Sequence, residues 1–206
     1  MSDLVLFGRS SSHFTRTARL FALELGVEHR FSPIFDMTVL DAAAYGDNPA
    51  LKMPVLVDSE GPLFGAENIC LDLARRAGRR EEVVLRGDVE SRVLANCEEL
   101  TLHVMSNEVT LILAKIAGDP GRVPEKVRRG VDNSLRFLDD NVDRALAALP
   151  AGRALSFFEA GLFSVLTHLP WREVMDVSAY RRLSSFTRSF GERGIARATE
   201  YKFDTP

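Results

Sequence analysis

The chain has 206 residues, 46% of them hydrophobic, which is enough for one large domain or two small ones with a buried core. Its formal net charge of −3 gives no positive excess for nucleic acid or an anionic membrane surface, so neither partner is expected. No apolar run approaches the roughly 20 residues of a membrane span. Residues 1–7 lack the basic region of a signal peptide, which favours a cytoplasmic protein.

The first third of the chain alternates short apolar strands with helices. Residues 4–7 form an apolar strand that stops at Gly8, and a polar turn then leads into a helix that Gly26 closes. Residues 28–34 suit a second strand. This order predicts a β-α-β unit with parallel strands and a right-handed crossover, with a ligand site where the first strand ends.

Pro54 stands directly before the apolar run 55–57. Because proline has no N–H for a strand ladder, it marks the entrance of a strand, where a cis peptide bond is expected. The N–H and C=O of Met53 are then left for an extended ligand, so the loop is a candidate peptide-binding segment.

The elements around this loop are predicted from turn residues and apolar spacing. A weak helix is expected at 39–45, and residues 58–61 give a hairpin signal before a strand at 63–64. A helix from Glu67 to about Ala77 ends this part of the chain.

Beyond the charged, turn-like residues 78–82 the pattern is helical throughout. Two long helices are expected, from Asp88 to a break at 118–121 and from 124 to 149, and they should form an antiparallel pair. Ser156 and Glu159 have the spacing of a capping box ahead of a further helix at 160–169. The predicted core residues are Val89, Val93, Cys97, Leu100, Val104, Val109, Ile112 and Ile116 in the first long helix, and Val127, Val131, Leu135, Leu138, Val142 and Leu146 in the second.

Two cysteines, Cys70 and Cys97, fall in apolar helical patterns. No CxxC pair or His/Cys spacing suggests a redox motif or a zinc site, so both are expected to be small core residues.

In this order, these features resemble the cytosolic glutathione S-transferases. The resemblance rests on Gly8 to Arg19 for the active-site turn, Lys52 to Leu56 for the cis-proline loop, Glu67-Asn68 for the following helix start, and Ser156 to Glu159 for the capping box. The segment 192–199 is similar to the family's closing segment. Asn68, His13 and Glu159 replace residues common in the family (Ser, Pro and Asp), which indicates a divergent member. The resemblance itself is to bacterial members of serine type.

The resemblance implies the glutathione S-transferase fold. An α/β thioredoxin-like domain of order βαβ-αββα is expected over residues 1–78, a linker over 79–87, and an all-α bundle over 88–206. It also implies glutathione as co-substrate, no metal, and a homodimer.

The family uses a hydroxyl or thiol at the end of the first strand to hold glutathione as its thiolate. Counting back from Arg19, which matches an arginine of the family, selects Ser12 for this role, with Ser11 and Ser10 as alternatives. The other interpretation is that these serines only cap the next helix, since serine is among the best N-cap residues.

The resemblance also assigns the residues that hold the tripeptide. Met53 and Pro54 supply the backbone platform, Asn68 binds the α-carboxylate, and Glu67 pairs with the ammonium group. An ordinary polar first turn of a helix would look the same. Lys52 is placed to meet the glycyl carboxylate, or is simply solvated.

The electrophile is expected in a cleft near His103 to Asn107, with Ser106 among its residues. His103 has a second interpretation as an ordinary surface or interface histidine. His13 either touches the ligand through its place beside Ser12 or is an exposed loop residue.

The expected activity is conjugation of the glutathione thiolate to a small hydrophobic electrophile. A glutathione-dependent isomerase, lyase or peroxidase on the same fold is one alternative, and a non-catalytic binding or interaction protein is another. Disulfide exchange is disfavoured because no cysteine lies at the active turn.

Overall fold

The computed structural model describes residues 3–119, 121 and 123–206. The chain divides into two compact units. The first contains the residues up to Val83 together with Gly194–Pro206, and the second contains Val84–Arg193. The division differs from the predicted one at the end of the chain, because the closing segment packs with the N-terminal unit. Pro120, in the predicted helix break, lies outside the described residues.

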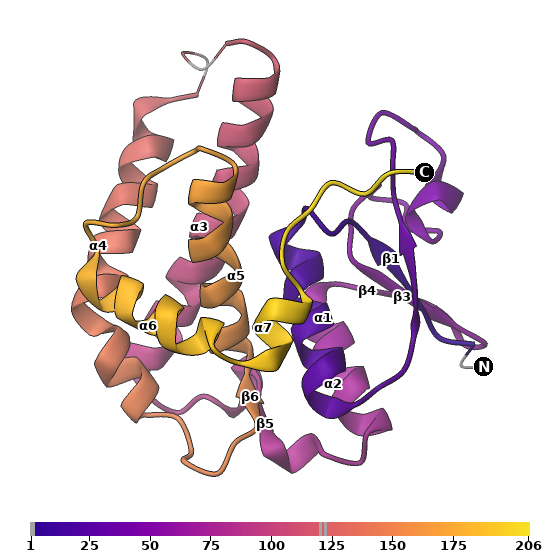
Figure 1. Ribbon diagram of the computed structural model, residues 1–206, viewed down its shortest axis with the longest axis horizontal. Helices are drawn as coiled ribbons and strands as arrows, with labels where there is room; N and C mark the ends of the chain where they lie inside the picture. Colours follow the sequence, from indigo (N-terminus) through magenta and orange to yellow (C-terminus); the bar gives the residue numbers. More distant parts are fainter. Residues whose placement is uncertain (1–2, 120, 122) are drawn as a thin grey trace. The chain divides into compact units, whose positions relative to one another are not determined.

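The first unit is built on a four-stranded sheet with the strand order β2-β1-β3-β4 (Figure 1). Strands β1 and β2 are parallel, as the predicted β-α-β unit requires, and the other two pairs are antiparallel. The strands are β1 (Val5–Gly8), β2 (Arg30–Pro33), β3 (Val55–Asp58) and β4 (Gly61–Phe64). β2 is shorter than the predicted 28–34, while the β3–β4 hairpin lies where its signal was found.

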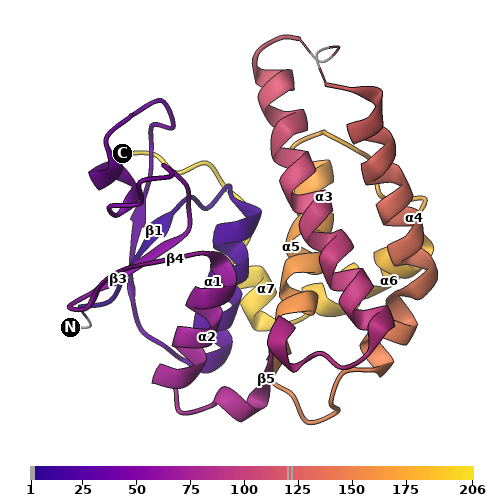
Figure 2. The same ribbon diagram turned by 180° about the vertical axis from the view of Figure 1, so that it is seen from behind.

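Two helices, α1 (His13–Leu25) and α2 (Ala66–Arg76), pack side by side on one face of this sheet (Figures 1 and 2). The apolar residues Ala18, Leu20, Phe21 and Leu25 of α1 are buried. Gly26 ends the helix in the left-handed conformation with φ of 68°. That conformation strains any residue with a Cβ, which explains the glycine. The helix α2 begins and ends within one residue of its prediction.

The predicted weak helix at 39–45 is a short 3-10 turn, η1 (Ala42–Tyr45). It ends at Gly46, which lies against the side chains of Phe7 and Val55. A Cβ at Gly46 would lie 2.9 Å from Phe7 Cδ2, so glycine allows this close approach to the sheet.

The connection between the units is ordered by short elements, η2 (Arg80–Glu82), β5 (Val83–Val84) and η3 (Arg86–Asp88). The sequence predicted only a charged linker here. The apolar residues Val83, Val84 and Leu85 are buried, which accounts for the local order.

Beyond β5, the regular elements described in the second unit are helices, apart from the two-residue strand β6 (Leu155–Ser156), which the sequence did not predict. Its helices are α3 (Arg92–Ile116), α4 (Glu125–Ala147), α5 (Phe157–Trp171) and α6 (Arg181–Gly191). Figure 2 shows α3 and α4 running side by side as the predicted antiparallel pair. Among the described residues, no helix has the length and apolar character needed to span a membrane.

The core face of α4 agrees with its prediction, whereas that of α3 does not. On α4, Val131, Leu135, Leu138 and Val142 are buried. On α3, only Cys97 and Val104 of the predicted set are buried, and Ile116 is 69% exposed. The buried face of α3 instead carries Leu94, Glu98, Thr101, Met105, Glu108 and Leu111.

Hydrogen bonding makes this polar face of α3 tolerable in the interior. The Glu108 carboxylate lies 2.8 Å from His168 Nδ1 on α5, and Thr101 donates to the Cys97 carbonyl at 2.8 Å. Burial raises the pKa of Glu108, and the hydrogen bond from His168 opposes that shift. Apolar spacing in the sequence does not predict these buried polar residues. A polar side chain is stable in the interior only when a hydrogen-bond partner is in place, and that partner can lie on another helix.

Candidate functional site

Strand register brings three predicted segments to one edge of the sheet in the first unit. Phe7, Val55 and Phe64 form a single row across β1, β3 and β4. Immediately beyond this row lie the serine turn after β1, Pro54 before β3, and the start of α2. The candidate glutathione residues of this unit therefore share one edge, although they are separated by more than fifty positions in the sequence.

The turn after β1 is held by Thr15. The Arg9 N–H donates to Thr15 Oγ1 at 3.4 Å, and the Ser12 N–H donates to the Arg9 carbonyl at 3.1 Å. A Cβ on Gly8 would lie 2.5 Å from Thr15 Cγ2, so only glycine lets the strand end approach this side chain. No sequence pattern identifies Thr15, because its role depends on a contact across the turn.

Ser12 is the N-cap of α1, so the interpretation that it caps this helix is correct. Its backbone is extended, and its Oγ accepts a hydrogen bond from the Thr15 N–H at 3.2 Å. A serine hydroxyl can accept and donate at once. Among the described residues, none accepts the hydrogen of this half-buried hydroxyl. Ser10 and Ser11 are more deeply buried, at 2% and 9% exposed.

His13 is the first residue of α1 and is buried, so it is not an exposed loop residue. Its ring centroid lies 4.6 Å from that of Phe14.

The peptide bond between Met53 and Pro54 is cis, as the sequence predicted. Within the described part of the chain, neither the N–H nor the C=O of Met53 has a hydrogen-bond partner. The preceding loop is organised by Asn48, which donates to the Lys52 carbonyl at 2.8 Å and accepts from the Ala50 N–H at 3.0 Å. Asn48 was not predicted as a site residue, and its only signal in the sequence is the turn-forming pair with Pro49. Lys52 itself is exposed.

The start of α2 has no side-chain cap. Gly65 occupies the N-cap position with φ of 90°, and it has no side chain that could accept hydrogen bonds from the N–H groups of the first turn. Glu67 is half-buried in the first turn, and Asn68 is exposed and donates from Nδ2 to the Phe64 carbonyl at 2.9 Å. Uncapped N–H groups and the helix dipole make such a terminus favourable for an anion.

Two arginines on α1 connect the site to the end of the chain. Arg16 is buried and donates to Thr199 and to the carbonyl of Ala196, both from the closing segment. Arg19 stacks on the ring of Phe31 at 5.1 Å. Burial lowers the pKa of Arg19, and the charge of Asp204 opposes that shift. The sequence pointed to Arg19 only as a family match, since Asp204 and the hydrogen-bond partners of Arg16 lie far along the chain.

The predicted residues of the electrophile cleft lie on α3 in the second unit. His103 and Ser106 are exposed and Asn107 is half-buried. His103 Nε2 lies 3.1 Å from a carboxylate oxygen of Glu99 one turn earlier.

The comparisons with known proteins agree with this architecture. Residues 6–81 match the model of the glutathione S-transferase N-terminal domain. No curated protein matches the chain by sequence.

Three similar solved structures come from bacteria. A glutathione S-transferase from Methylobacillus flagellatus with glutathione bound is 19% identical, with a TM-score of 0.74 over 97% of this chain and 100% of that one. One from Methylobacterium radiotolerans in complex with glutathione sulfonate is 14% identical, with a TM-score of 0.73 over 100% and 98%. A glutathione transferase family member from Pseudomonas fluorescens with bound glutathione is 18% identical, with a TM-score of 0.73 over 97% and 99%.

At these identities the solved structures establish the fold. The first unit is the thioredoxin-like half, and the helices of the second correspond to the C-terminal domain. Residues 6–81 therefore form a glutathione S-transferase N-terminal domain, and the chain as a whole has the fold of the solved glutathione S-transferases.

Proposed function

We propose that the protein is a glutathione transferase that conjugates the glutathione thiolate to a small hydrophobic electrophile. The observation that carries the proposal is the strand register, which brings the Ser12 turn, the Met53 backbone and the uncapped start of α2 to one sheet edge. Glutathione offers a thiol, a peptide backbone and an α-carboxylate, and these three segments match them in chemical type.

Ser12 is the proposed thiolate-stabilising residue. A free thiol has a pKa of about 8.5, so at neutral pH most glutathione in solution is protonated. Lowering that pKa by about two units requires roughly 2.7 kcal/mol. One hydrogen bond to a charged group contributes about 1.5 to 3 kcal/mol, which is of the required size. The Ser12 hydroxyl hydrogen is supported for this role because the described residues offer it no other acceptor.

The rest of the tripeptide is assigned to groups on the same edge. The Met53 amide pairs with the ligand backbone beside Pro54. The α2 N-terminus and Asn68 hold the α-carboxylate, and Glu67 pairs with the ammonium group. Lys52 meets the glycyl carboxylate.

The proposed electrophile residues are His13, His103, Ser106 and Asn107. Their role is tested separately from glutathione binding, because substitutions there should change the choice of electrophile and leave the affinity for glutathione unaltered.

Calorimetric titration with glutathione, followed by a conjugation assay with a chlorodinitrobenzene, tests the proposal. Binding with turnover supports the transferase. Absence of binding at millimolar glutathione overturns the catalytic proposal. Binding without conjugation directs the search to an isomerase, lyase or peroxidase reaction, or to a non-catalytic role, and assays with peroxide and double-bond substrates separate these.

We also propose that the protein is a homodimer, as the family resemblance implies. Large apolar side chains are exposed near the end of α3, where Leu113 is 60% and Ile116 69% exposed. Leu113→Glu should weaken association as measured by light scattering, and a monomeric wild-type protein at micromolar concentration would contradict the proposal. A cytoplasmic location remains a prediction, with Cys70 and Cys97 both free thiols.

A further inference from the structure

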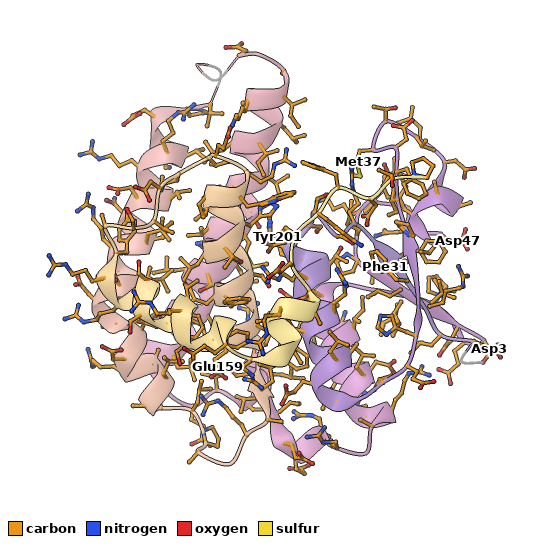
Figure 3. All side chains as sticks on the ribbon, viewed as in Figure 1. Asp3, Phe31, Met37, Asp47, Glu159 and Tyr201 are labelled. Atoms are coloured by element: carbon orange, nitrogen blue, oxygen red, sulfur yellow. The ribbon has the colours of Figure 1, made fainter. Side chains whose placement is uncertain are left out.

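The last residues of the chain form a tail that is fastened to α1 at its root. Arg16 donates from Nη2 to the Ala196 carbonyl at 3.0 Å and from Nε to Thr199 Oγ1 at 3.2 Å. The Arg16 guanidinium also lies 4.4 Å from the ring centroid of Tyr201. Figure 3 shows Tyr201 on the tail beside the N-terminal half of α1. These contacts are buried or half-buried, so the root of the tail belongs to the folded unit.

The tip of the tail differs from its root. Lys202, Thr205 and Pro206 are exposed, and Phe203 is 61% exposed. Asp204 is half-buried, and its Oδ2 accepts a hydrogen bond from the Ser10 N–H at 2.7 Å. This short, charge-assisted bond places a carboxylate on the same turn that carries Ser12.

The charges around that turn favour an anion. Arg9 lies in the turn and Arg16 and Arg19 follow on α1, all three at least half-buried. Nη1 of Arg19 and Nε of Arg9 are buried and have no hydrogen-bond partner in the described part of the chain. Burial lowers the pKa of Arg19, and the charge of Asp204 partly offsets that shift.

We propose that Asp204 is a detachable latch, a carboxylate of the protein's own tail that competes with the anionic sulfur of glutathione for the Ser10–Ser12 turn. The proposal rests on the proposed function, because it assumes that the sulfur binds at Ser12. It identifies Asp204 as a residue that sets selectivity between charged and neutral sulfur groups.

The competition has a simple electrostatic reason. Ser10 and Ser12 are two residues apart, so a carboxylate bound to the Ser10 N–H and an anionic sulfur at Ser12 would be close like charges. Their repulsion is strong at the reduced dielectric of a half-buried site. An anionic ligand replaces the Asp204 carboxylate as the counterion of the arginines. The affinity for a ligand with a neutral sulfur does not increase when that carboxylate leaves. The fastened root keeps the tip near the turn in both states.

Two glutathione derivatives that share the tripeptide and differ at sulfur test the latch. Glutathione sulfonate carries a negative charge there, and S-methylglutathione is neutral. Asp204→Asn keeps an oxygen acceptor for the Ser10 N–H and removes the charge. Glu200→Gln is the matched control, because Glu200 is an exposed tail carboxylate whose side chain has no hydrogen bond or ion pair within the described residues.

Calorimetric titration of the full-length variants should show a selective effect. We expect Asp204→Asn to bind glutathione sulfonate about tenfold more tightly than wild type, with a change of less than about twofold for S-methylglutathione. Glu200→Gln should leave both affinities at the wild-type value. Thermal melting of each variant confirms that it is folded.

The outcomes separate the latch from the proposed function. If wild type binds both compounds and Asp204→Asn has an unchanged ratio of affinities, the latch is overturned and the function stands. If neither protein binds either compound at millimolar concentration, the proposed function is overturned. The competition between Asp204 and the ligand sulfur is then overturned as well. Weaker binding of both compounds by Asp204→Asn would mean that Asp204 supports the turn, which also contradicts the latch.

Discussion

Two helices in different units begin with a serine N-cap, and the two caps differ in whether the hydrogen of the serine hydroxyl is already donated to a protein acceptor. At α5, the Ser156 Oγ accepts from the Glu159 N–H at 3.1 Å and donates to Glu159 Oε2 at 2.7 Å. At α1, the Ser12 Oγ accepts from the Thr15 N–H at 3.2 Å, and the third position carries no carboxylate.

The α5 box is closed further by a partly buried ion pair. Glu159 also accepts from the Ser156 N–H at 3.2 Å, and Arg153 donates to both of its carboxylate oxygens at 2.8 and 2.7 Å. A reciprocal box thus consumes the hydroxyl, and an incomplete cap leaves its hydrogen for a ligand. A serine cap is therefore a functional candidate when the side chain three residues later does not accept the hydrogen of its hydroxyl.

Removing the carboxylate of the closed box should give the largest loss of stability. Glu159→Ala deletes two hydrogen bonds to Ser156 and leaves Arg153 without its partner, so we expect the free energy of unfolding to fall by about 3 kcal/mol. Chemical denaturation measures this. Glu99→Ala, which breaks the exposed pairs with Arg86 and His103, should cost less than about 1 kcal/mol. Equal losses in the two variants would mean that the box is not a special source of stability.

Removing the Ser12 hydroxyl should change the conjugation rate more than the stability. We expect Ser12→Ala to lower the conjugation rate at neutral pH about 10- to 100-fold, because a hydrogen bond to the thiolate is lost, while the free energy of unfolding falls by only about 1 kcal/mol. The pKa of the bound thiol should rise by about one to two units, so the variant regains activity as the pH is raised.

A titration of thiolate absorbance in the glutathione complex checks this shift, and Ser156→Ala is the control that should leave it unchanged. An unaltered rate in Ser12→Ala would transfer the proposed role to Ser11 or Ser10.

The glycines four residues before each cap provide a third contrast. Gly8→Ala places a Cβ 2.5 Å from Thr15 Cγ2, so we expect a loss of about 1.5 kcal/mol and weaker glutathione binding as the turn shifts. At Gly152, no atom lies within 4 Å of an added Cβ, so Gly152→Ala should change stability by less than about 0.5 kcal/mol. Thermal melts and glutathione titrations of both variants measure the difference. A neutral Gly8→Ala would show that the turn adapts to the added methyl group.

A smaller effect than at Gly8 is expected at Ser156. Ser156→Ala removes one cap hydroxyl but leaves Glu159 paired with Arg153, so we expect about 1 kcal/mol of lost stability and no change in glutathione affinity. Denaturation and calorimetry on the same preparation give both numbers. A loss of glutathione affinity here would break the distinction between the structural and the functional cap.

The helices α3 and α4 show which buried residues the sequence can predict. The predicted core stripe of α4 is largely correct because its buried residues are apolar and recur at helical spacing. The prediction for α3 is wrong over most of its length because Glu98, Thr101 and Glu108 occupy the buried face, while Val109 and Ile116 are exposed. Periodicity cannot identify a buried carboxylate whose partner, His168, lies on another helix.

The candidate site shows the same division. The cis bond before Pro54 and the Ser156 capping box were predicted because each is encoded by a few neighbouring residues. The roles of Thr15 and Asn48 were missed because they depend on how the backbone turns around each side chain.

The sequence by itself determined the local elements of this protein: the β-α-β start, the cis-proline loop, the start of α2 and the capping box. Short-range sterics and hydrogen bonding specify each of them within a few residues. Only the tertiary structure decided that three of these segments share one sheet edge, and that Asp204 reaches the Ser10 N–H across 194 positions. Such contacts depend on how the whole unit folds, and no local pattern records them.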